Sequence, residues 1–523
     1  MFDFLIHSPI AHFAREMPEH AALGFSGAEL SYSELDVTSN QLANALIALG
    51  LKPGGRVGIF MHKSLELGTA IYGVLKAGGI FVPIDPFSPV ARLQFIIEDC
   101  GIEHIVSADA MSRSLSPLAG TFTGQVYGVG VDVGLNTVTW EQVATYSHEL
   151  PDVWIIDQDL AYIMYTSGST GHPKGMMHSH HGSISYARWG AQHVALTSAD
   201  RIASHAPLHF DLSIFDFFST SQSGATVVLV PEPVTKFAAS WTRYIEEERI
   251  SVVFTVPFTL IEMLQRGAMD KCDLSSLRWV LFGGEPIAAK HLRALMQKLP
   301  DVRFTNVYGP AEAPSCTCYD IPPFPEPFDE PVPIGTTSQN SDALIVEEDG
   351  RECEIGNEGE LCIRSSTLTK GYWNRPDLNE HAFLHRESFG PFPDVYYRTG
   401  DIVLQHEDGQ LRFLGRRDRM VKTRGHRVEL DEVEAVLNAY PDVSEAATIA
   451  VPDAHGSKTI LAAIKFRDKA NSDEGSVLKH ARAILPSYAV PQSLHTVTEF
   501  PRTSSGKIDR KELANKIVNT GDL

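Results

Sequence analysis

The chain of 523 residues has few of the features that mark several large protein classes. Its six cysteines are scattered, which is typical of a reducing compartment and excludes a disulfide framework. Cys316 and Cys318 lack a second Cys or His pair at zinc spacing, so a zinc knuckle is not expected. No apolar run approaches the roughly 20 residues of a membrane helix, and no signal peptide is evident at the N-terminus. These absences predict a cytoplasmic protein with no membrane partner.

Positive charge is also scarce, because the formal net charge is −21 at pH 7. This charge argues against a nucleic-acid partner, since the phosphate backbone would be repelled over most of the surface. The segment 416–427, RRDRMVKTRGHR, is a local exception, with six Arg or Lys residues against one Asp. It fits either a solvated basic turn or a positive rim at an active site that also meets an anionic partner.

The order of apolar runs predicts an α/β fold with at least two domains, because the chain is too long for one core. Residues 1–410 alternate strand-like runs with amphipathic helical ones, which favours parallel or mixed sheets covered by helices. Within this region, 69–84 reads as a core helix followed by a strand. After a proline-rich connection at 322–333, residues 343–365 read as short strands joined by Asp-Gly and Gly-Asn turns, hence a small β-subdomain.

Residues 162–178, YIMYTSGSTGHPKGMMH, form the most informative motif. A strand-like apolar run leads into a loop of small residues, which brings backbone N–H groups, hydroxyls and a Lys close to a polyphosphate. The Walker A spacing is not met, because Pro173 precedes the Lys and a Gly follows it. The alternative is a Ser/Gly surface turn, which the flanking strand and the Pro-Lys-Gly ending disfavour. The candidate phosphate-binding residues are Thr166, Ser167, Gly168, Ser169, Thr170, Gly171 and Lys174.

Five further motifs follow in order, and with the loop they make the chain resemble one enzyme family. They are HFDLSIFD at 209–216, NVYGPAEA at 306–313, YRTGD at 397–401, GRRDRMVKTRGHRVELDEVE at 415–434 and PRTSSGKIDR at 501–510. The chain is identified as a member of the AMP-forming adenylation superfamily, which includes acyl-CoA synthetases, luciferases and the amino-acid adenylation domains of nonribosomal peptide synthesis. The resemblance covers nearly the whole chain.

The resemblance also implies a domain organisation. Residues 1–415 would form the adenylation core and 420–523 a small mobile α+β lid. Residues 416–419 would be the hinge between them, with Asp418 as its pivot. Without the family motifs, Asp418 would be read as part of an ordinary Arg/Asp-rich turn.

By the same resemblance, ATP and Mg²⁺ are the expected cofactors, and two residues act in the chemistry. Lys507 matches the family's catalytic Lys, although a lone Lys near a C-terminus is normally a solvated surface residue. Glu312 matches the Mg²⁺-associated Glu, and a carboxylate suits a hard cation that bridges phosphate oxygens.

The remaining residues would bind other parts of the nucleotide. Tyr308 and Asn306 would contact the adenine, Asp401 would accept hydrogen bonds from the ribose hydroxyls, and Arg416 would contact the ribose or a phosphate. Without the motifs, the Tyr would be read as a core residue and the Asn and Asp as turn residues. The full set is Asn306, Tyr308, Gly309, Asp401, Phe413 and Arg416.

The acid pocket is expected around Asp211. In amino-acid adenylation domains the Asp of Phe-Asp-x-Ser pairs with the substrate ammonium, and Asp211 matches it. A carboxylate in an apolar wall demands a cation, whereas the alternative is a helix N-cap. No other charged residue is expected in the pocket, so a small or aliphatic amino acid is predicted. The other candidate pocket residues are Leu212, Phe215, Phe254, Val280, Phe282, Val307, Ser315 and Cys316.

The resulting prediction is a stand-alone ligase that forms aminoacyl-AMP and passes the acyl group to the phosphopantetheine thiol of a separate carrier protein. The segments 204–218 and 278–287 resemble enzymes that load β-amino acids in macrolactam antibiotic biosynthesis, so an α- and a β-amino acid both stay open. The alternatives are an acid–CoA ligase and a catalytically idle docking protein. A monomer or weak dimer is expected.

Overall fold

A computed structural model describes residues 4–168, 172–323, 332–417, 419–453, 457–467, 473–502 and 508–519. The chain divides into two compact units, which are described separately. Unit 1 comprises 1–86, 97–165 and 175–417, and unit 2 comprises 87–96, 166–174 and 418–523. The last boundary falls inside the predicted hinge 416–419, and Asp418 itself lies outside the described residues. The sequence did not predict that 87–96 and 166–174 group with the C-terminal part.

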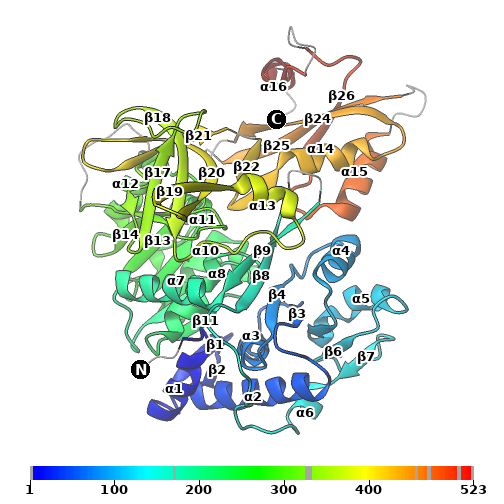
Figure 1. Cartoon of the computed structure of the whole chain (residues 1–523), viewed down its shortest axis with the longest axis vertical. Coiled ribbons are helices and arrows are strands. Elements are labelled where there is room, and N and C mark those ends of the chain that lie inside the picture. The colour runs from blue at the N-terminus through cyan, green and yellow to red at the C-terminus, as the bar shows by residue number, and fades with distance from the viewer. Residues whose placement is uncertain are drawn as a thin grey trace. The chain divides into compact units, whose positions relative to one another are not determined.

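Unit 1 contains two large sheets whose strands are mainly parallel (Figure 1). The seven-stranded sheet has the order β7-β6-β5-β3-β4-β8-β9, and the nine-stranded sheet has the order β16-β15-β14-β13-β12-β10-β11-β1-β2. In the nine-stranded sheet the central pairs from β1 to β14 are parallel, whereas β2, β15 and β16 pair antiparallel at its edges. Parallel strands need crossover helices, so this arrangement follows from the alternation of strand-like and helical runs in the sequence.

The strands of the seven-stranded sheet are β3 Arg56–Ile59, β4 Ile80–Pro83, β5 His104–Val106, β6 Gln125–Tyr127, β7 Asn136–Val138, β8 Leu160–Thr166 and β9 Lys174–Ser179. Those of the nine-stranded sheet are β1 Ala21–Phe25, β2 Ala28–Ser31, β10 Arg201–Ser204, β11 Thr226–Leu229, β12 Val252–Thr255, β13 Trp279–Gly283, β14 Arg303–Tyr308, β15 Thr317–Asp320 and β16 Thr336–Thr337.

The helices before the third sheet are α1 Ser8–Glu16, α2 Tyr32–Ala48, α3 Leu65–Lys76, α4 Val90–Cys100, α5 Ser112–Leu115, α6 Trp140–Val143, α7 His180–His193, α8 Leu212–Ile214, α9 Glu232–Thr235, α10 Ala238–Glu247, α11 Pro257–Arg266 and α12 Ala289–Lys298. Short 3₁₀ helices occupy η1 Asp109–Met111, η2 Ser116–Leu118 and η4 Met269–Lys271, and η3 Phe215–Ser219 is a π-helix. No helix in the described ranges is long and apolar enough to cross a membrane.

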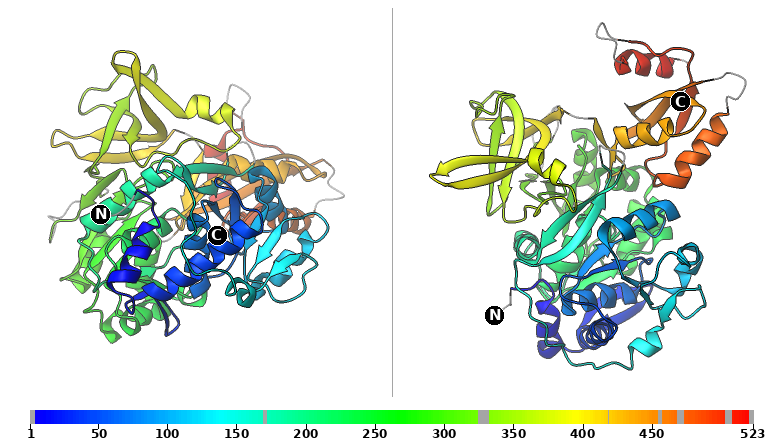
Figure 2. Two further views of the ribbon diagram at one scale, coloured as in Figure 1. Left: turned by 60° about the horizontal axis from the view of Figure 1, so that its bottom comes forward. Right: turned by 45° about the vertical axis from the view of Figure 1, so that its right-hand side comes forward.

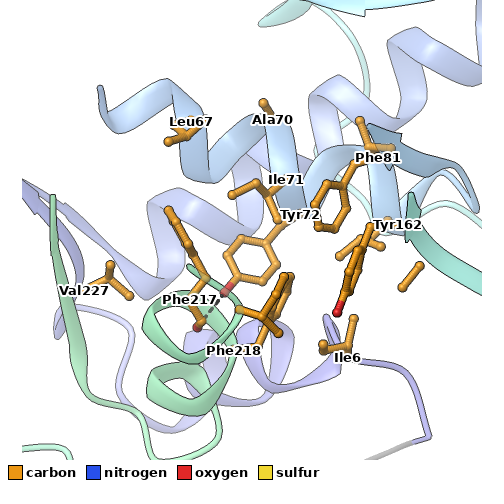
Figure 3. Packing of buried hydrophobic residues seen from close by; sticks show 14 of the residues in the cluster. Ile6, Leu67, Ala70, Ile71, Tyr72, Phe81, Tyr162, Phe217, Phe218 and Val227 are labelled. Carbon is orange, nitrogen blue, oxygen red and sulfur yellow. Dashed lines mark hydrogen bonds between the residues drawn. The ribbon is translucent and has the colours of Figure 1, made fainter. Parts of the chain in front are cut away.

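The main core of unit 1 joins the two large sheets around helix α3. Every residue of α3 from Leu67 to Lys76 is buried, and β4 follows, which confirms the predicted core helix and strand at 69–84. Tyr72 of α3 lies between Phe81 of the seven-stranded sheet and Phe217 and Phe218 of η3 (Figure 3). This core therefore places the π-helix directly against α3.

A third sheet completes unit 1 and is larger than the predicted β-subdomain (Figure 2). Its antiparallel strands are β17 Ser341–Val346, β18 Glu358–Ser365, β19 Phe383–Phe389, β20 Phe392–Gln405 and β21 Leu411–Arg416, with α13 Pro376–Ala382 before β19. The predicted turns contain Gly350 and Gly356 at φ of 85° and 90°, a conformation that favours glycine. The sheet extends to Arg416 because YRTGD and GRR lie on paired strands.

Unit 2 is an α+β structure with its own core. Its elements are β22 Met420–Thr423, β23 His426–Glu429, α14 Leu430–Asn438, β24 Val443–Pro452, β25 Lys458–Phe466, α15 Glu474–Ile484, β26 Ser493–Thr496 and α16 Arg510–Asn519. Arg424 and Gly425, both at positive φ, turn the chain between β22 and β23. Arg419 pairs with Asp431 and with Glu434, the latter at 2.6 Å, so the basic segment is not simply a solvated turn.

Candidate active site

Three of the predicted nucleotide-binding residues meet in unit 1, where β14 ends beside β20 and β21. The Tyr308 hydroxyl donates to Asp401 Oδ2 at 2.5 Å, and Arg416 donates to Asp401 Oδ1. Asp401 and Arg416 are paired residues of antiparallel strands, and Asp401 is only 3% exposed. A carboxylate has about four lone-pair sites, so two remain on Asp401 for the hydroxyls of a ribose. Burial, with the nearby Asp401, raises the pKa of Tyr308 well above its ordinary value, so the hydroxyl keeps its proton.

Asn306 and Phe413 lie close to this group. Asn306 Nδ2 donates to the Pro333 carbonyl at 2.8 Å, which fixes the amide while one N–H remains available. Phe413 packs against the buried cluster that contains Tyr308, so its ring belongs to the same wall. The aromatic and amide groups that the sequence assigned to adenine are therefore neighbours of the carboxylate assigned to ribose.

Gly309 has a structural role that the sequence did not reveal. A Cβ at this position would lie 2.4 Å from Ser315 N and 2.6 Å from the Ala313 carbonyl oxygen. The loop after Tyr308 thus folds back over Gly309, and Ser315 adopts a left-handed φ of 52° at the point of return. Gly309 is needed for this loop to close, in addition to any approach of a nucleotide.

We expect Gly309→Ala to raise the KM values for ATP and for the acid together, each by about tenfold or more, because Ser315 and Tyr308 must move apart. Overpacking of this kind should also lower the free energy of unfolding by about 1–3 kcal/mol. Gly130→Ala is the matched control, since the nearest atoms lie 3.8 Å from its added Cβ. Steady-state kinetics and thermal unfolding of both variants test this, and unchanged KM values in Gly309→Ala would contradict it.

Glu312 is completely buried, with 0% of its surface exposed. Tyr372 Oη donates to Glu312 Oε1 at 2.6 Å and lies 3.2 Å from the Tyr397 hydroxyl. Burial lowers the pKa of the neighbouring His178 to about 4, although the negative charge of Glu312 acts to raise it. No group of three metal-ligating side chains exists in the part of the chain that the structure describes. A single carboxylate fits Mg²⁺, which is commonly held by one or two carboxylates and by substrate phosphates.

The phosphate loop belongs to unit 2, and Ser169, Thr170 and Gly171 lie outside the described residues. A Cβ on Gly168 would lie 2.0 Å from the His172 carbonyl oxygen, so the loop closes on itself at this glycine. Thr166 Oγ1 is buried without a hydrogen-bond partner among the described groups. This is expected of a hydroxyl whose role is to donate to a bound phosphate. Ser167 Oγ instead donates to the Arg427 carbonyl at 2.7 Å, and Lys174 is buried.

Asp211 stands at the first turn of α8 but does not cap it. It occupies the N-cap position with helical φ and ψ of −60° and −25°, and its side chain makes no capping hydrogen bond. Ser213 does not cap α8 from its side chain either, since its hydroxyl donates backward to the Phe210 carbonyl at 2.6 Å. The N-cap interpretation of Asp211 is therefore wrong. The charge of Asp211 contributes to raising the pKa values of Tyr162 and Tyr186, two tyrosines that sequence reasoning did not place near it.

Three predicted acid-pocket residues lie in one apolar cluster. The rings of Phe215 and Phe254 are perpendicular, with centroids 5.4 Å apart, and Val307 belongs to the same cluster. Leu212 packs against its edge. The structure thus brings together an apolar wall beside Asp211, with side chains from η3, β12 and β14.

Val280 and Phe282 were assigned to this pocket wrongly. They lie on the other face of the nine-stranded sheet, in a separate cluster with Trp241 and Phe304. Side chains alternate along a strand, so Leu281 faces the Phe254 side, and a Cβ on Gly283 would lie 3.8 Å from the Phe254 ring. Leu281 and Gly283, each one residue further along β13, therefore take the places predicted for Val280 and Phe282. The apolar run WVLF has no polar residue that could reveal which face is which.

The two polar candidates differ in their surroundings. The side chain of Ser315 forms a hydrogen bond with Tyr186. Burial raises the pKa of Tyr186, and this hydrogen bond acts in the opposite direction. Cys316 is fully buried in the Tyr308 cluster, and its Sγ lies 3.6 Å from the Tyr308 carbonyl oxygen. Cys316 thus contacts the nucleotide wall rather than the Phe215–Phe254 cluster. Lys507 and Asp418 lie outside the described residues.

Strand β14 separates the two groups of candidate residues. Val307 faces the Phe215–Phe254 cluster, whereas Tyr308 belongs to the cluster with Phe413. Asn306 pairs with Phe282 on the neighbouring parallel strand, so it shares the opposite face from Val307. One strand thus presents an apolar residue to one side and polar or aromatic residues to the other.

Comparison with known proteins shows which family this chain matches. The AMP-binding enzyme family matches residues 10–373, and the AMP-binding enzyme C-terminal domain matches 432–507. The chain is 36% identical to the L-proline–[L-prolyl-carrier protein] ligase of Pseudomonas fluorescens, over 98% of this chain and 99% of that protein. It is 34% identical to tyrocidine synthase 1 of Brevibacillus parabrevis over 97% of this chain, and spans only 44% of that protein.

A solved structure has the same fold throughout. The Vibrio cholerae adenylation domain AlmE, in complex with glycyl-adenosine-5'-phosphate, superposes with a TM-score of 0.86. It is 25% identical, and the match covers 99% of this chain and 98% of that one. The predicted fold class, a large N-terminal α/β part with a small β-subdomain and a smaller α+β C-terminal part, is confirmed.

Proposed function

Because the chain belongs to the AMP-binding enzyme family, whose ligases use ATP, we propose that it adenylates an amino acid and transfers it to a carrier-protein thiol. Asp211 carries the amino-acid part of this proposal. Its carboxylate is half-buried beside an apolar cluster and does not cap α8, so it is placed to pair with a substrate ammonium. The Pseudomonas fluorescens relative, matched over nearly its whole length, supports the carrier-protein acceptor.

In the first step an oxygen of the substrate carboxylate attacks the α-phosphorus of ATP, and pyrophosphate leaves. Two anions must approach each other, so the site has to neutralise charge and hold the attack in line. Asp401, held by Tyr308 and Arg416, would fix the ribose, and Thr166 and Lys174 would bind phosphate oxygens. Mg²⁺ would neutralise phosphate charge, with Glu312 as its carboxylate. Lys507 would reach both reacting groups.

In the second step the carrier thiol attacks the acyl carbon, and AMP leaves. The apolar wall of Phe215, Phe254, Val307 and Leu281 fits a small or aliphatic side chain. Gly283 adds no side chain to this wall, and a Cβ there would lie 2.3 Å from the Val307 carbonyl oxygen, so no larger residue fits at this position. Moving the amine one carbon from the carboxylate still allows contact with Asp211, so the substrate class includes α- and β-amino acids.

Amino-acid-dependent exchange of labelled pyrophosphate into ATP tests the first step, using a panel of α- and β-amino acids and their deaminated analogues. Exchange with amino acids and little with the analogues is expected. Exchange with no acid would support a catalytically idle docking protein, and a preference for deaminated acids would overturn the proposed substrate class. Thioester formation on CoA or on a holo-carrier protein then separates the acid–CoA ligase alternative from the proposal.

The hinge proposal gives a prediction for the two steps. Asp418→Pro should fix φ near −65° and hinder rotation about this residue, so thioester transfer should fall more than adenylate formation. Rapid-quench measurement of both half-reactions tests this. Equal loss of both, or no loss, would show that Asp418 is not the pivot.

A further inference from the structure

A half-buried lysine bonds to the strand end that leads to Asp211 and Phe215. Lys63 follows β3, in the loop before α3, and its Nζ donates to the Ser204 carbonyl at 2.5 Å and to the His205 carbonyl at 2.9 Å. These carbonyls stand at the end of β10, from which the chain runs on to Asp211. Lys63 therefore fixes the start of the segment that forms one side of the acid pocket.

The other end of that segment carries Asp216, the second Asp of HFDLSIFD. Asp216 is 0% exposed, and the Ser204 hydroxyl interacts with its carboxyl group. Burial raises the pKa of Asp216 well above its ordinary value, and Lys63 is the foremost group that opposes this rise. Burial in turn lowers the pKa of Lys63 to about 8, against the opposing charges of Asp216 and Glu232.

Asp216 belongs to the π-helix η3, Phe215–Ser219, whose position is tightly constrained. The Tyr72 hydroxyl donates to the Phe217 carbonyl at 3.2 Å (Figure 3). A Cβ on Gly190 of α7 would lie 2.4 Å from Ser219 Oγ and 2.7 Å from the Phe215 ring, so α7 packs directly on the turn. π-Helical turns are rare and occur often at functional sites. This turn sets the direction in which Phe215 points.

We infer that Lys63 is a positioning residue for the acid pocket: its ammonium group holds the start of the 204–216 segment by the carbonyls of Ser204 and His205. Asp211 and Phe215 lie on that segment, so Lys63 sets where the substrate ammonium and side chain bind. Lys63 itself does not contact the substrate. The inference rests on the proposed function, because it assigns Lys63 to the recognition of the amino acid.

The test uses the full-length enzyme and the best amino acid from the exchange panel. Lys63→Met keeps the length of the side chain and removes its charge. It should raise the KM for the amino acid by about tenfold or more while the KM for ATP and kcat stay within about twofold. The preference for the amino acid over its deaminated analogue should fall as well, because Asp211 is displaced. Lys52→Met, at an exposed lysine, is the matched control and should behave as the parent does.

A second variant separates positioning from simple loss of stability. Asp216→Asn, added to Lys63→Met, removes the buried carboxyl group that the first change leaves without a neighbouring cation, so it should recover thermal stability while the KM for the amino acid stays raised. A return of this KM to the parent value would overturn the inference, because the bonds from Lys63 to the two carbonyls are still missing. A parent-like KM in Lys63→Met would overturn the inference. So would a proportional loss of kcat and of both KM values that the second substitution does not repair. If the unmodified enzyme exchanges pyrophosphate with no amino acid, the proposed function fails instead, which is a different result.

Discussion

Asp211→Asn is expected to lower kcat/KM for the amino acid by about a hundredfold or more. Without the carboxylate, the substrate ammonium enters an apolar pocket with no partner, and breaking a buried pair costs roughly 3–5 kcal/mol. Since about 1.4 kcal/mol corresponds to a tenfold change, this penalty predicts the stated loss. Pyrophosphate exchange measured over a range of amino-acid concentrations gives the value directly.

The deaminated analogue of the same acid is the control for this variant. It carries no ammonium, so Asp211→Asn should affect it far less, although it is a poor substrate for the parent. A pocket that is merely destabilised would lose both activities in proportion. If the Asn variant uses the amino acid as well as the parent does, Asp211 does not bind the ammonium, and the acid–CoA ligase alternative becomes the better explanation.

Lys507→Ala is expected to lower adenylate formation by several orders of magnitude. The side chain is proposed to neutralise charge between the carboxylate and the α-phosphate, and such electrostatic contributions are typically large. Thioester transfer from a preformed aminoacyl-AMP should survive, because that step does not bring the two anions together. Separate assays of the half-reactions, with Lys511→Ala as a nearby control, provide the measurement. Equal loss in both steps would contradict this role.

Much of the fold could be predicted because the apolar runs have clear lengths and limits. The core helix and strand at 69–84 were recognisable from an apolar stretch too short and too rich in glycine for a membrane helix. The size of the β-subdomain was underestimated. Strands β20 and β21 contain the charged motifs YRTGD and GRR, and such polar sequences are more typical of loops. Antiparallel pairing, rather than local hydrophobicity, makes these residues strands.

The nucleotide site was easier to predict than the acid pocket for a physical reason. Polar groups such as Asp401, Tyr308 and Arg416 occur in distinctive motifs, and the structure brings these three together. Val280 and Phe282 were placed on the wrong face because both faces of a central parallel strand are buried and apolar. The role of Lys63 was not predicted at all, since Lys63 and Ser204 are 141 positions apart and meet only through the packing of two sheets.

The alternation along β14 has a consequence for how such an enzyme could change its substrate. Val307 and Leu281 face one way, whereas Asn306 and Tyr308 face the other, so a mutation that reshapes the apolar pocket leaves the opposite face of the strand untouched. New acids could be accepted in evolution, or by directed redesign, without rebuilding the machinery that activates them. A library restricted to Leu281 and Val307 would therefore be expected to diversify acid preference while the affinity for ATP is retained; Gly283 is left unchanged, because a Cβ there would lie 2.3 Å from the Val307 carbonyl oxygen.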